Sequence, residues 1–149
     1  MAIYVDVSAA VHAKAGIGRY AGSLARALVA REPHRFALFY NRGRGTEAPR
    51  GLEAVPARTI RAGYKPWRMA VWLGQLARLS FGRLVPGAEL FHATEHLLPP
   101  FRGVRTVLTV HDMIIKLFPQ HQKPLNYRYL NATMTLYCRR ADAIITVSD

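Results

Sequence analysis

Short runs of apolar residues alternate with amphipathic segments along most of this chain. The apolar runs, each interpreted as a strand, are residues 2–7, 36–40, 57–60, 89–92, 106–110 and 143–147. Helical spacing of apolar residues predicts helices over 18–31, 66–84 and 124–141. Strands that are apolar on both faces need cover on both sides, which a parallel sheet between two helix layers provides. The sequence therefore predicts an α/β fold with a doubly wound, mainly parallel sheet.

The composition limits the class of partner. The chain has 149 residues, of which 50% are hydrophobic, enough for one domain with its own core. It has 21 basic and 9 acidic residues and a net charge of +12, which favours an anionic partner. No helix-turn-helix, zinc-finger or RNA-binding pattern accompanies the charge, so we expect no nucleic acid. The single cysteine, Cys138, excludes a disulfide framework.

The two ends of the chain carry further expectations. The first residues lack the basic and apolar regions of a signal peptide, and no apolar run reaches the ~18 residues of a membrane-spanning helix. We therefore expect a cytoplasmic protein. Ser148 and Asp149, which suit a helix N-cap, follow the last predicted strand directly. Since a parallel sheet needs a crossover there, we expect a helix to begin and the chain to be a piece of a longer protein.

A glycine-containing segment follows the first predicted strand. It contains Gly16, Ile17, Gly18 and Arg19. Such glycines either form an ordinary βα turn or let backbone amides approach a phosphate at a helix N-terminus. The third glycine of the dinucleotide-binding pattern is missing because Ala21 stands there, and no acidic residue follows the second strand. A dinucleotide-dependent dehydrogenase is therefore disfavoured.

Histidines follow two other strands. His111 and Asp112 come directly after residues 106–110, at the carboxyl end where ligands bind in open α/β sheets. His111 is thus a candidate to bind or polarise a substrate group, or else a buried histidine bonded to backbone. His92 and Glu95 belong to an H-x-x-E-H sequence, the order of an inverzincin zinc helix. Because this sequence follows a strand and runs into two prolines, we expect a loop near the site and no metal.

The predicted helix 66–84 is strongly basic. Arg68, Arg78 and Arg83 share one arc of its helical wheel with Trp72. This pattern fits a membrane-interface helix, and it also fits a helix buried on one side with arginine stems packed on the other.

Four motifs occur in a particular order. They are Gly16-Ile17-Gly18-Arg19-Tyr20, Leu90-Phe91-His92 leading to Leu98-Pro99-Pro100, Val110-His111-Asp112, and the run from Ala141 to Ser148. Together they resemble the N-terminal domain of family 4 glycosyltransferases, which are retaining, nucleotide-sugar-dependent enzymes of the GT-B fold. The resemblance spans nearly the whole chain. It implies that residues 1–149 form the acceptor-side, Rossmann-like domain, incomplete at its C-terminal end, and that the nucleotide-binding domain is missing.

The resemblance also implies roles for these residues. His111 would lie at the donor sugar, with Asp112 orienting His111 or its loop. The segment Gly16, Ile17, Gly18 and Arg19 would close on the donor phosphates. Lys14 and Arg19 would meet a phosphate of the donor or the acceptor, and Lys14 is assigned to the acceptor side. From topology alone, we expect His12, His92 and Glu95 to line the acceptor pocket.

The partners implied by the resemblance are a nucleotide sugar as donor and a saccharide or lipid-linked acceptor, with no tightly bound cofactor. Many members act in bacterial polysaccharide biosynthesis, so an anionic membrane surface at the inner face of the cell membrane is a further expected partner. The rival interpretation is a non-enzymatic Rossmann-like or basic membrane-peripheral binding module. A glycosyltransferase gene would continue past Asp149 into a second domain with paired glutamates, whereas a module would stop there.

Overall fold

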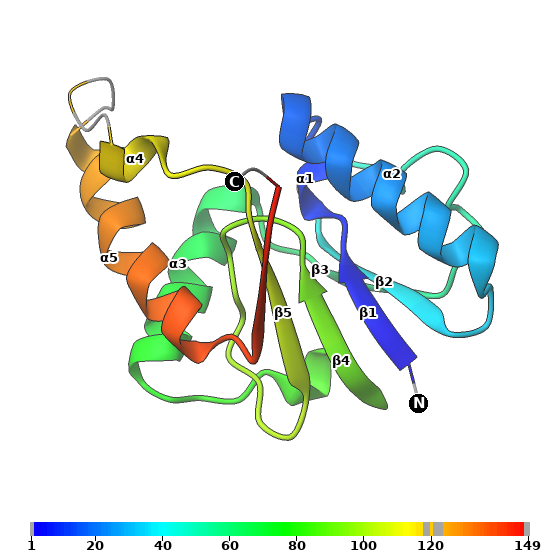
Figure 1. Ribbon diagram of the computed structural model, residues 1–149. Helices are drawn as coiled ribbons and strands as arrows, with labels where there is room; N and C mark the ends of the chain where they lie inside the picture. Colours follow the sequence, from blue (N-terminus) through cyan, green and yellow to red (C-terminus); the bar gives the residue numbers. More distant parts are fainter. Residues whose placement is uncertain (1, 118–119, 121–123, 148–149) are drawn as a thin grey trace.

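A six-stranded parallel sheet forms the centre of the protein (Figure 1). The computed structural model describes residues 2–117, 120 and 124–147. The strands are β1 (Ala2–Asp6), β2 (Phe36–Asn41), β3 (Ala57–Ile60), β4 (Ala88–Ala93), β5 (Arg105–Val110) and β6 (Ala143–Thr146). They lie in the order β3-β2-β1-β4-β5-β6, and each neighbouring pair is parallel. The predicted doubly wound parallel α/β fold is therefore confirmed.

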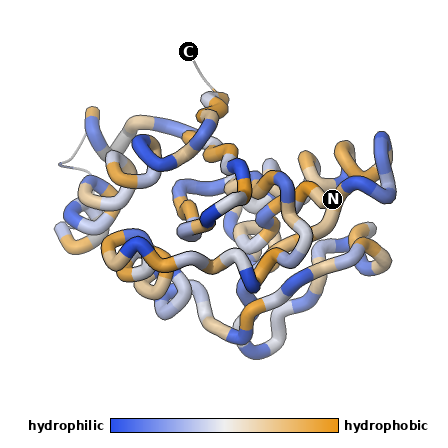
Figure 2. The backbone as a smooth tube through the Cα atoms, turned by 90° about the horizontal axis from the view of Figure 1, so that it is seen from below, coloured by the Kyte–Doolittle hydropathy of each residue, from blue (hydrophilic) through white to orange (hydrophobic). Residues whose placement is uncertain are grey.

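Helices cover both faces of this sheet. They are α1 (Ser8–Val11), α2 (Ala15–Arg31), α3 (Tyr64–Leu76), the 3₁₀ helix η1 (Gly82–Leu84), α4 (Ile114–Leu117) and α5 (Pro124–Arg140). Figure 1 shows α1 and α2 on one side and α3 and α5 on the other. Figure 2 shows orange and blue residues mixed within single helices, as expected for helices with one face on a core and one in solvent.

The two faces of β2 illustrate why the sheet needs helices on both sides. Ala37 and Phe39 join the core cluster under α3 and α5, whereas Phe36, Leu38 and Tyr40 join the cluster under α2. Successive side chains of a strand point to opposite faces, so a continuously apolar strand is buried only between two layers. The apolar runs seen in the sequence therefore determine the layered architecture.

Helix α2 begins earlier than the sequence predicted. Residues from Ala15 onward are helical, and Ser8–Val11 already forms α1, so the expected glycine loop is in fact the first turn of α2. The reason is close packing between the two helices. A Cβ on Gly18 would lie 2.7 Å from the carbonyl oxygen of Ala9, a separation that only glycine permits.

Helix α3 ends well before residue 84, so the predicted helix 66–84 is wrong in its second half. After Leu76 the chain turns, with Arg78 at φ +52° and the Leu79 amide donating to the Gly74 carbonyl at 2.9 Å. This pattern is a Schellman-type helix end, in which glycine normally occupies the left-handed position. Because arginine occupies that position here, the sequence carried no stop signal. Phe81 then folds back over Gly74, where a Cβ would be only 2.7 Å from its ring.

The other predicted elements agree with the structure within two residues at each end. The expected helix start at Ser148 and Asp149 lies outside the described residues. None of the helices in the described ranges is long and apolar enough to cross a membrane.

Candidate functional site

Polar side chains collect where the strand order reverses. β1 and β4 are neighbours at the centre of the sheet, but the chain leaves β1 toward β2 and leaves β4 toward β5. The connections therefore diverge from this point, which is where open α/β sheets bind ligands. The carboxyl ends of four strands contribute polar residues here: Asp6, Asn41, Thr94 and His111.

A partly buried ion pair joins the connection after β1 to the connection after β4. Lys14 Nζ lies 2.9 Å from Glu95 Oε2, and the Glu95 side chain is only 1% exposed. Tyr64, the first residue of α3, donates its hydroxyl to the same oxygen at 3.2 Å. The Lys14 ammonium also lies 3.2 Å from the centroid of the Tyr64 ring, a cation–π contact. Three elements thus converge on one carboxylate.

Burial sets the protonation behaviour of this cluster. Burial lowers the pKa of Lys14, and the charge of Glu95 opposes that effect. The pKa of Tyr64 is raised, first by burial and then by the Glu95 carboxylate. Glu95 Oε1 is buried and has no hydrogen-bond partner within residues 2–117, 120 and 124–147. An unpartnered buried carboxylate oxygen is costly, so this cluster carries an unfavourable contribution to folding at Glu95.

A second network ties the ends of β1, β2 and β3 together. The Ser8 amide donates to Asp6 Oδ1 at 2.8 Å, and the Asn41 amide donates to Ser8 Oγ at 3.1 Å. Asn41 Nδ2 donates to the Ala62 carbonyl at 2.9 Å. His12 Nε2 lies 3.0 Å from the Asn41 carbonyl, and its ring meets the Tyr64 ring edge-on at 5.8 Å. His12, Lys14 and Glu95 therefore belong to one continuous arrangement around Tyr64.

Asp6 is fully buried within this network. Burial, with a smaller contribution from the Glu95 carboxylate, raises the pKa of Asp6 from 3.8 to about 7. Its Oδ2 has no hydrogen-bond partner among the residues that the structure describes. Asp6 thus holds a proton near neutral pH, which reduces the like-charge repulsion with Glu95.

His111 is held from two directions at the end of β5. Its Nε2 lies 2.7 Å from the carbonyl oxygen of Thr94, and its ring meets the Tyr20 ring edge-on at 4.9 Å. Because a carbonyl oxygen only accepts, Nε2 must carry the hydrogen, and in neutral His111 the Nδ1 atom is an acceptor. The hydroxyl of Thr94 in turn donates to the Asp6 carbonyl at 2.6 Å. His111 is therefore oriented by the same two strands that hold the ion pair.

The histidines of the H-x-x-E-H sequence do not form a zinc helix. His92 lies in β4, with its Nε2 2.9 Å from Thr109 Oγ1. Burial lowers the pKa of His92 to about 4, and burial also lowers the pKa of His96 to about 4. No group of three or more potential ligands among histidine, cysteine, aspartate and glutamate occurs in the described parts of the chain. His92 faces Thr109 and lies apart from the contacts around Tyr64.

The segment from Gly16 to Arg19 begins α2 and faces open space on one side. A Cβ on Gly16 would meet nothing within 4 Å, and Arg19 is exposed. Gly16, Arg19 and Tyr20 lie on one open face of α2. Tyr20 connects this face to His111. Asp112, which follows His111, is exposed.

Sequence reasoning overlooked several residues of this site. Asp6, Asn41 and Thr94 are polar residues at carboxyl ends of buried strands, so the rule that selected His111 could have selected them too. Tyr64 carries no such signal, because its role depends on where the start of α3 packs.

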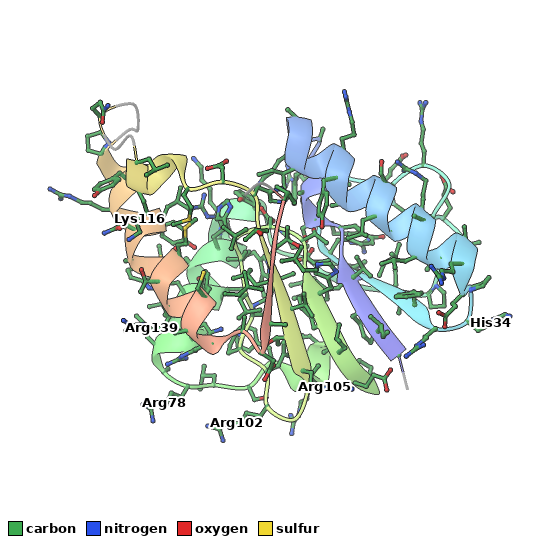
Figure 3. All side chains as sticks on the ribbon, in the orientation of Figure 1. His34, Arg78, Arg102, Arg105, Lys116 and Arg139 are labelled. Atoms are coloured by element: carbon green, nitrogen blue, oxygen red, sulfur yellow. The ribbon has the colours of Figure 1, made fainter. Side chains whose placement is uncertain are left out.

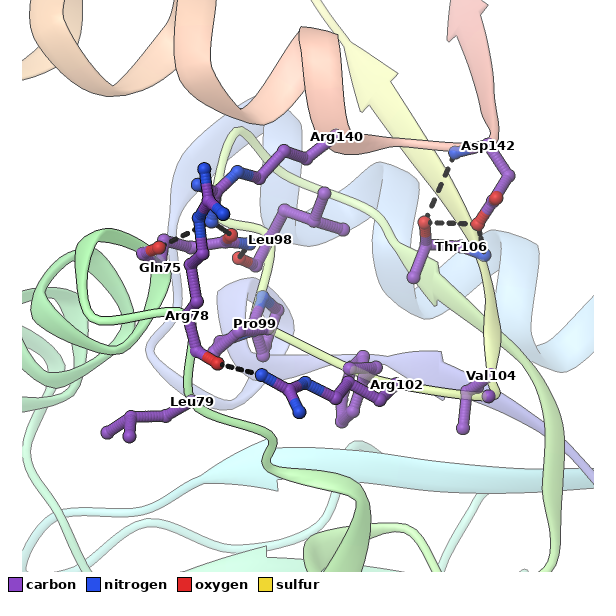
Figure 4. Close-up of a pocket in the computed structure, with 13 residues that line it drawn as sticks. Gln75, Arg78, Leu79, Leu98, Pro99, Arg102, Val104, Thr106, Arg140 and Asp142 are labelled. Atoms are coloured by element: carbon purple, nitrogen blue, oxygen red, sulfur yellow. Dashed lines mark hydrogen bonds between the residues drawn. The ribbon is translucent and has the colours of Figure 1, made fainter.

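A separate cavity of about 380 Å³ lies at the other end of the sheet (Figure 4). Figure 4 shows Arg140 bonded to Gln75 and Arg102 bonded to the carbonyl of Arg78, the second contact measuring 2.8 Å. The Asp142 carboxylate also lines this cavity, and it accepts a hydrogen bond of 2.7 Å from the backbone amide of Thr106 in β5. These contacts join α5 to α3 and the end of the following turn to β5, so we assign this cavity a structural role.

The fold and the polar carboxyl edge define an open α/β domain of the Rossmann-like class, in which strand-end residues meet at a reversal of strand order. The model of the family described as Glycosyltransferase Family 4 matches residues 15–149. The chain therefore belongs to glycosyltransferase family 4, and its fold is that of the N-terminal domain of a GT-B protein. Comparisons with curated proteins and with solved structures gave no significant match.

The two glycines at the start of α2 should respond oppositely to alanine. Gly16→Ala should raise the free energy of unfolding by about 0.5 kcal/mol, because alanine is the better helix former and its Cβ has room. Gly18→Ala should lower it by about 1–3 kcal/mol, because its Cβ would meet the Ala9 carbonyl oxygen. Urea unfolding followed by circular dichroism measures both. Equal effects of the two substitutions would contradict the packing described here.

Stability should depend on pH through Asp6 and two histidines. Between about pH 4 and 6.5 the unfolded chain binds a proton on His92 and on His96 that the folded protein does not bind. In the same window the folded protein keeps the Asp6 proton that the unfolded chain loses. For these three groups together, the unfolded chain binds one proton more than the folded protein. The free energy of unfolding should therefore rise by about 1.4 kcal/mol per pH unit in this window.

Asp6→Asn isolates the aspartate contribution, since asparagine keeps an oxygen for the Ser8 amide. This variant should show a slope about one proton steeper than the wild type between pH 4.5 and 6.5. Urea titrations at three pH values in that range give the slopes. Parallel slopes for the two proteins would show that Asp6 is ionised in the folded state.

Proposed function

We propose that this chain is the acceptor-side domain of a retaining glycosyltransferase, which moves a sugar from a nucleotide-sugar donor to a saccharide or lipid-linked acceptor. Membership of glycosyltransferase family 4 supports the transfer of a sugar in general. The single observation that carries the proposal is the fixed orientation of His111 on Thr94, the residue before the ion-paired Glu95.

In this proposal His111 faces the transferring sugar. Its Nε2–H is committed to the Thr94 carbonyl, so its Nδ1 accepts a hydrogen bond from a sugar hydroxyl. Cleavage of the bond between sugar and diphosphate develops positive charge on the sugar ring. The imidazole fixed at this edge stabilises that charge through its acceptor nitrogen. Asp112 lies next in the chain and serves to orient the loop.

The donor phosphates are proposed to meet the N-terminus of α2. A helix leaves its first backbone amides without intrahelical partners, and its dipole favours an anion there. The first turn of α2 contains no acidic residue and no side-chain cap. Gly16 and Ile17 present their backbone to the ligand, Gly18 keeps the turn against α1, and Arg19 adds a positive charge.

The acceptor is proposed to bind around the Lys14–Glu95 pair. Lys14, whose side chain is 25% exposed and is positioned by Glu95 and Tyr64, donates to an oxygen of the acceptor. His12 borders the same cluster through Tyr64. His92 contributes from β4 by fixing Thr109, which Tyr20 also approaches at 3.5 Å.

The remaining half of the site is proposed to come from a nucleotide-binding domain further along the natural protein. The exposure of Ile144 and Ile145 on the edge strand β6, at 47% and 40%, supports a covering partner at this edge of the sheet. We propose that no cofactor or metal is tightly bound, that the protein is cytoplasmic, and that this domain alone does not turn over.

Substitution of His111 tests the central claim. In the full-length natural protein, His111→Gln should lower kcat about 100-fold, because glutamine can still donate to the Thr94 carbonyl but does not reproduce the imidazole acceptor. The measurement is nucleoside diphosphate release from a panel of nucleotide sugars. His34→Gln is the matched control, since His34 lies in an exposed turn far from this edge (Figure 3). Undiminished turnover of the His111 variant, with an unchanged circular dichroism spectrum, would favour a binding module.

A second proposal concerns the exposed face of α3. Met69, Leu73 and Leu76 form one stripe and are 44–55% exposed, and Leu79 follows at 53%. Lys65 continues the stripe at its start, and Figure 3 shows Arg78 projecting outward beyond its end. An apolar stripe with basic ends is complementary to an anionic leaflet. We propose that this stripe docks the protein peripherally on an anionic membrane surface.

Vesicle co-sedimentation tests this docking. The protein should bind vesicles of anionic phosphatidylglycerol and should not bind vesicles of zwitterionic phosphatidylcholine. The double variant Leu73→Gln and Leu76→Gln should bind about tenfold more weakly, since two leucines no longer enter the bilayer. Leu125→Gln, on an 83% exposed leucine of α5, is the control. Equal binding to both vesicle types would rule the docking out.

A further inference from the structure

Three arginines surround a hollow beyond the ends of β2 and β3. Its volume is about 470 Å³. The residues that line it are Arg42, Gly43, Arg44, Gly45, Thr46, Arg61 and Gly63. Arg42 follows β2 and Arg61 follows β3, so both arise from the carboxyl edge of the sheet. This arginine hollow thus lies on the same edge as the candidate site.

The charge of the arginine hollow is uncompensated. No acidic residue lines it, and none of the three guanidinium groups forms an ion pair with a described residue. Glu47 follows Thr46 in the chain but is exposed and is not part of the lining. Three like charges around one hollow repel one another and attract an anion.

The backbone of the arginine hollow is suited to close approach by a ligand. Gly45 has φ +71°, a conformation that side chains rarely adopt. The Thr46 hydroxyl donates to the Gly43 carbonyl at 3.1 Å, which fixes the turn that presents Arg44. Glycines on the wall leave backbone amides uncovered, and successive amides in such turns bind anions.

The arginine hollow adjoins the cluster around the Lys14–Glu95 pair. Gly63 lines the hollow, and the next residue, Tyr64, bonds to Glu95. Arg42 lines the hollow, its amide donates to the Ile60 carbonyl at 2.8 Å, and the preceding residue, Asn41, accepts from His12. Two residues that line the hollow, Arg42 and Gly63, are thus chain neighbours of two residues of the cluster, Asn41 and Tyr64.

The cavity at the other end of the sheet differs in these respects. There Arg140 and Arg102 already donate to protein oxygens, and Asp142 supplies a negative charge. The arginine hollow has neither feature, so its charge is available to a ligand.

We propose that the arginine hollow binds a phosphate or diphosphate group of the acceptor, so that the acceptor is a phosphorylated one. This inference rests on the proposed function. Guanidinium groups bind the oxygens of a phosphate through paired hydrogen bonds. A carboxylate has fewer oxygens, so it would leave more of the donors of three arginines without a partner. With the phosphate held by Arg42, Arg44 and Arg61, the acceptor's sugar or alcohol end extends past Gly63 toward Tyr64 and Glu95.

Binding of inorganic pyrophosphate tests this site directly. The protein should bind pyrophosphate in isothermal titration, and the double variant Arg42→Gln and Arg61→Gln should bind it at least about tenfold more weakly. The matched control is Arg105→Gln, because Arg105 is an exposed arginine at the opposite edge of the sheet, as Figure 3 shows. Equal affinity of the wild type and the double variant would overturn the proposal.

Two further arms separate the possible sources of the phosphate. If uridine diphosphate displaces pyrophosphate from the wild type and its own binding falls in the double variant, the hollow serves the donor and the proposal fails. If the double variant loses binding to phosphatidylglycerol vesicles, the hollow binds lipid headgroups and the proposal also fails. Unchanged binding of both ligands, with weakened pyrophosphate binding, supports an acceptor phosphate.

The outcome is distinguishable from failure of the proposed function. In one outcome, pyrophosphate binding depends on the two arginines, but the full-length protein releases no nucleoside diphosphate from any donor. The hollow would then remain an anion site, and the proposed glycosyltransferase activity would be rejected. Turnover that continues with pyrophosphate bound equally to wild type and double variant would keep the enzyme and reject the hollow.

Discussion

The ion pair between Lys14 and Glu95 holds the carboxyl edge of the sheet together. Lys14 stands just before α2, Glu95 just after β4, and Tyr64 at the start of α3 bonds to the same oxygen. The pair therefore crosses the point where the strand order reverses and joins both helix layers to it. Loss of Lys14 would leave the buried Glu95 carboxylate without its cation, which costs far more than a surface ion pair contributes. The contact thus links the segments after β1 and β4 to the start of α3.

The apolar strands made the architecture predictable. A run such as Phe36–Tyr40 is buried on both faces, which requires a parallel sheet with a layer of helices on each face. All six predicted strands were found. Two helix boundaries were wrong. Helix α2 already begins at Ala15, before the predicted start at Gly18, and α3 stops where Arg78 adopts a left-handed conformation. Neither arrangement follows from local residue preference.

The site was predictable to the extent that topology determines it. The carboxyl-end rule selected His111 and Glu95, and Lys14 was selected as a basic residue beside the glycine segment; the structure brings Lys14 and Glu95 into contact. The same rule did not reveal that His92 faces Thr109, because a strand-end residue can point to either face. Tyr64 was not predictable, since nothing in its local sequence indicates that α3 begins against Glu95. The functional roles of these residues stay predictions.

The positive charge of the chain is unevenly compensated at this edge. At the centre, Lys14 is matched by Glu95, Asp6 holds its proton near neutral pH, and Arg68 lies over the rings of Tyr64 and Tyr129. These groups neutralise or cover one another, so the centre is organised to fix hydrogen-bonding directions rather than to attract charge. The arginines beyond β2 and β3 have no such partners among the described residues. The arginines that attract an anion and the groups that orient a ligand's hydroxyls therefore lie at separate places along one edge. Gly63 and Asn41 connect the two places along the chain.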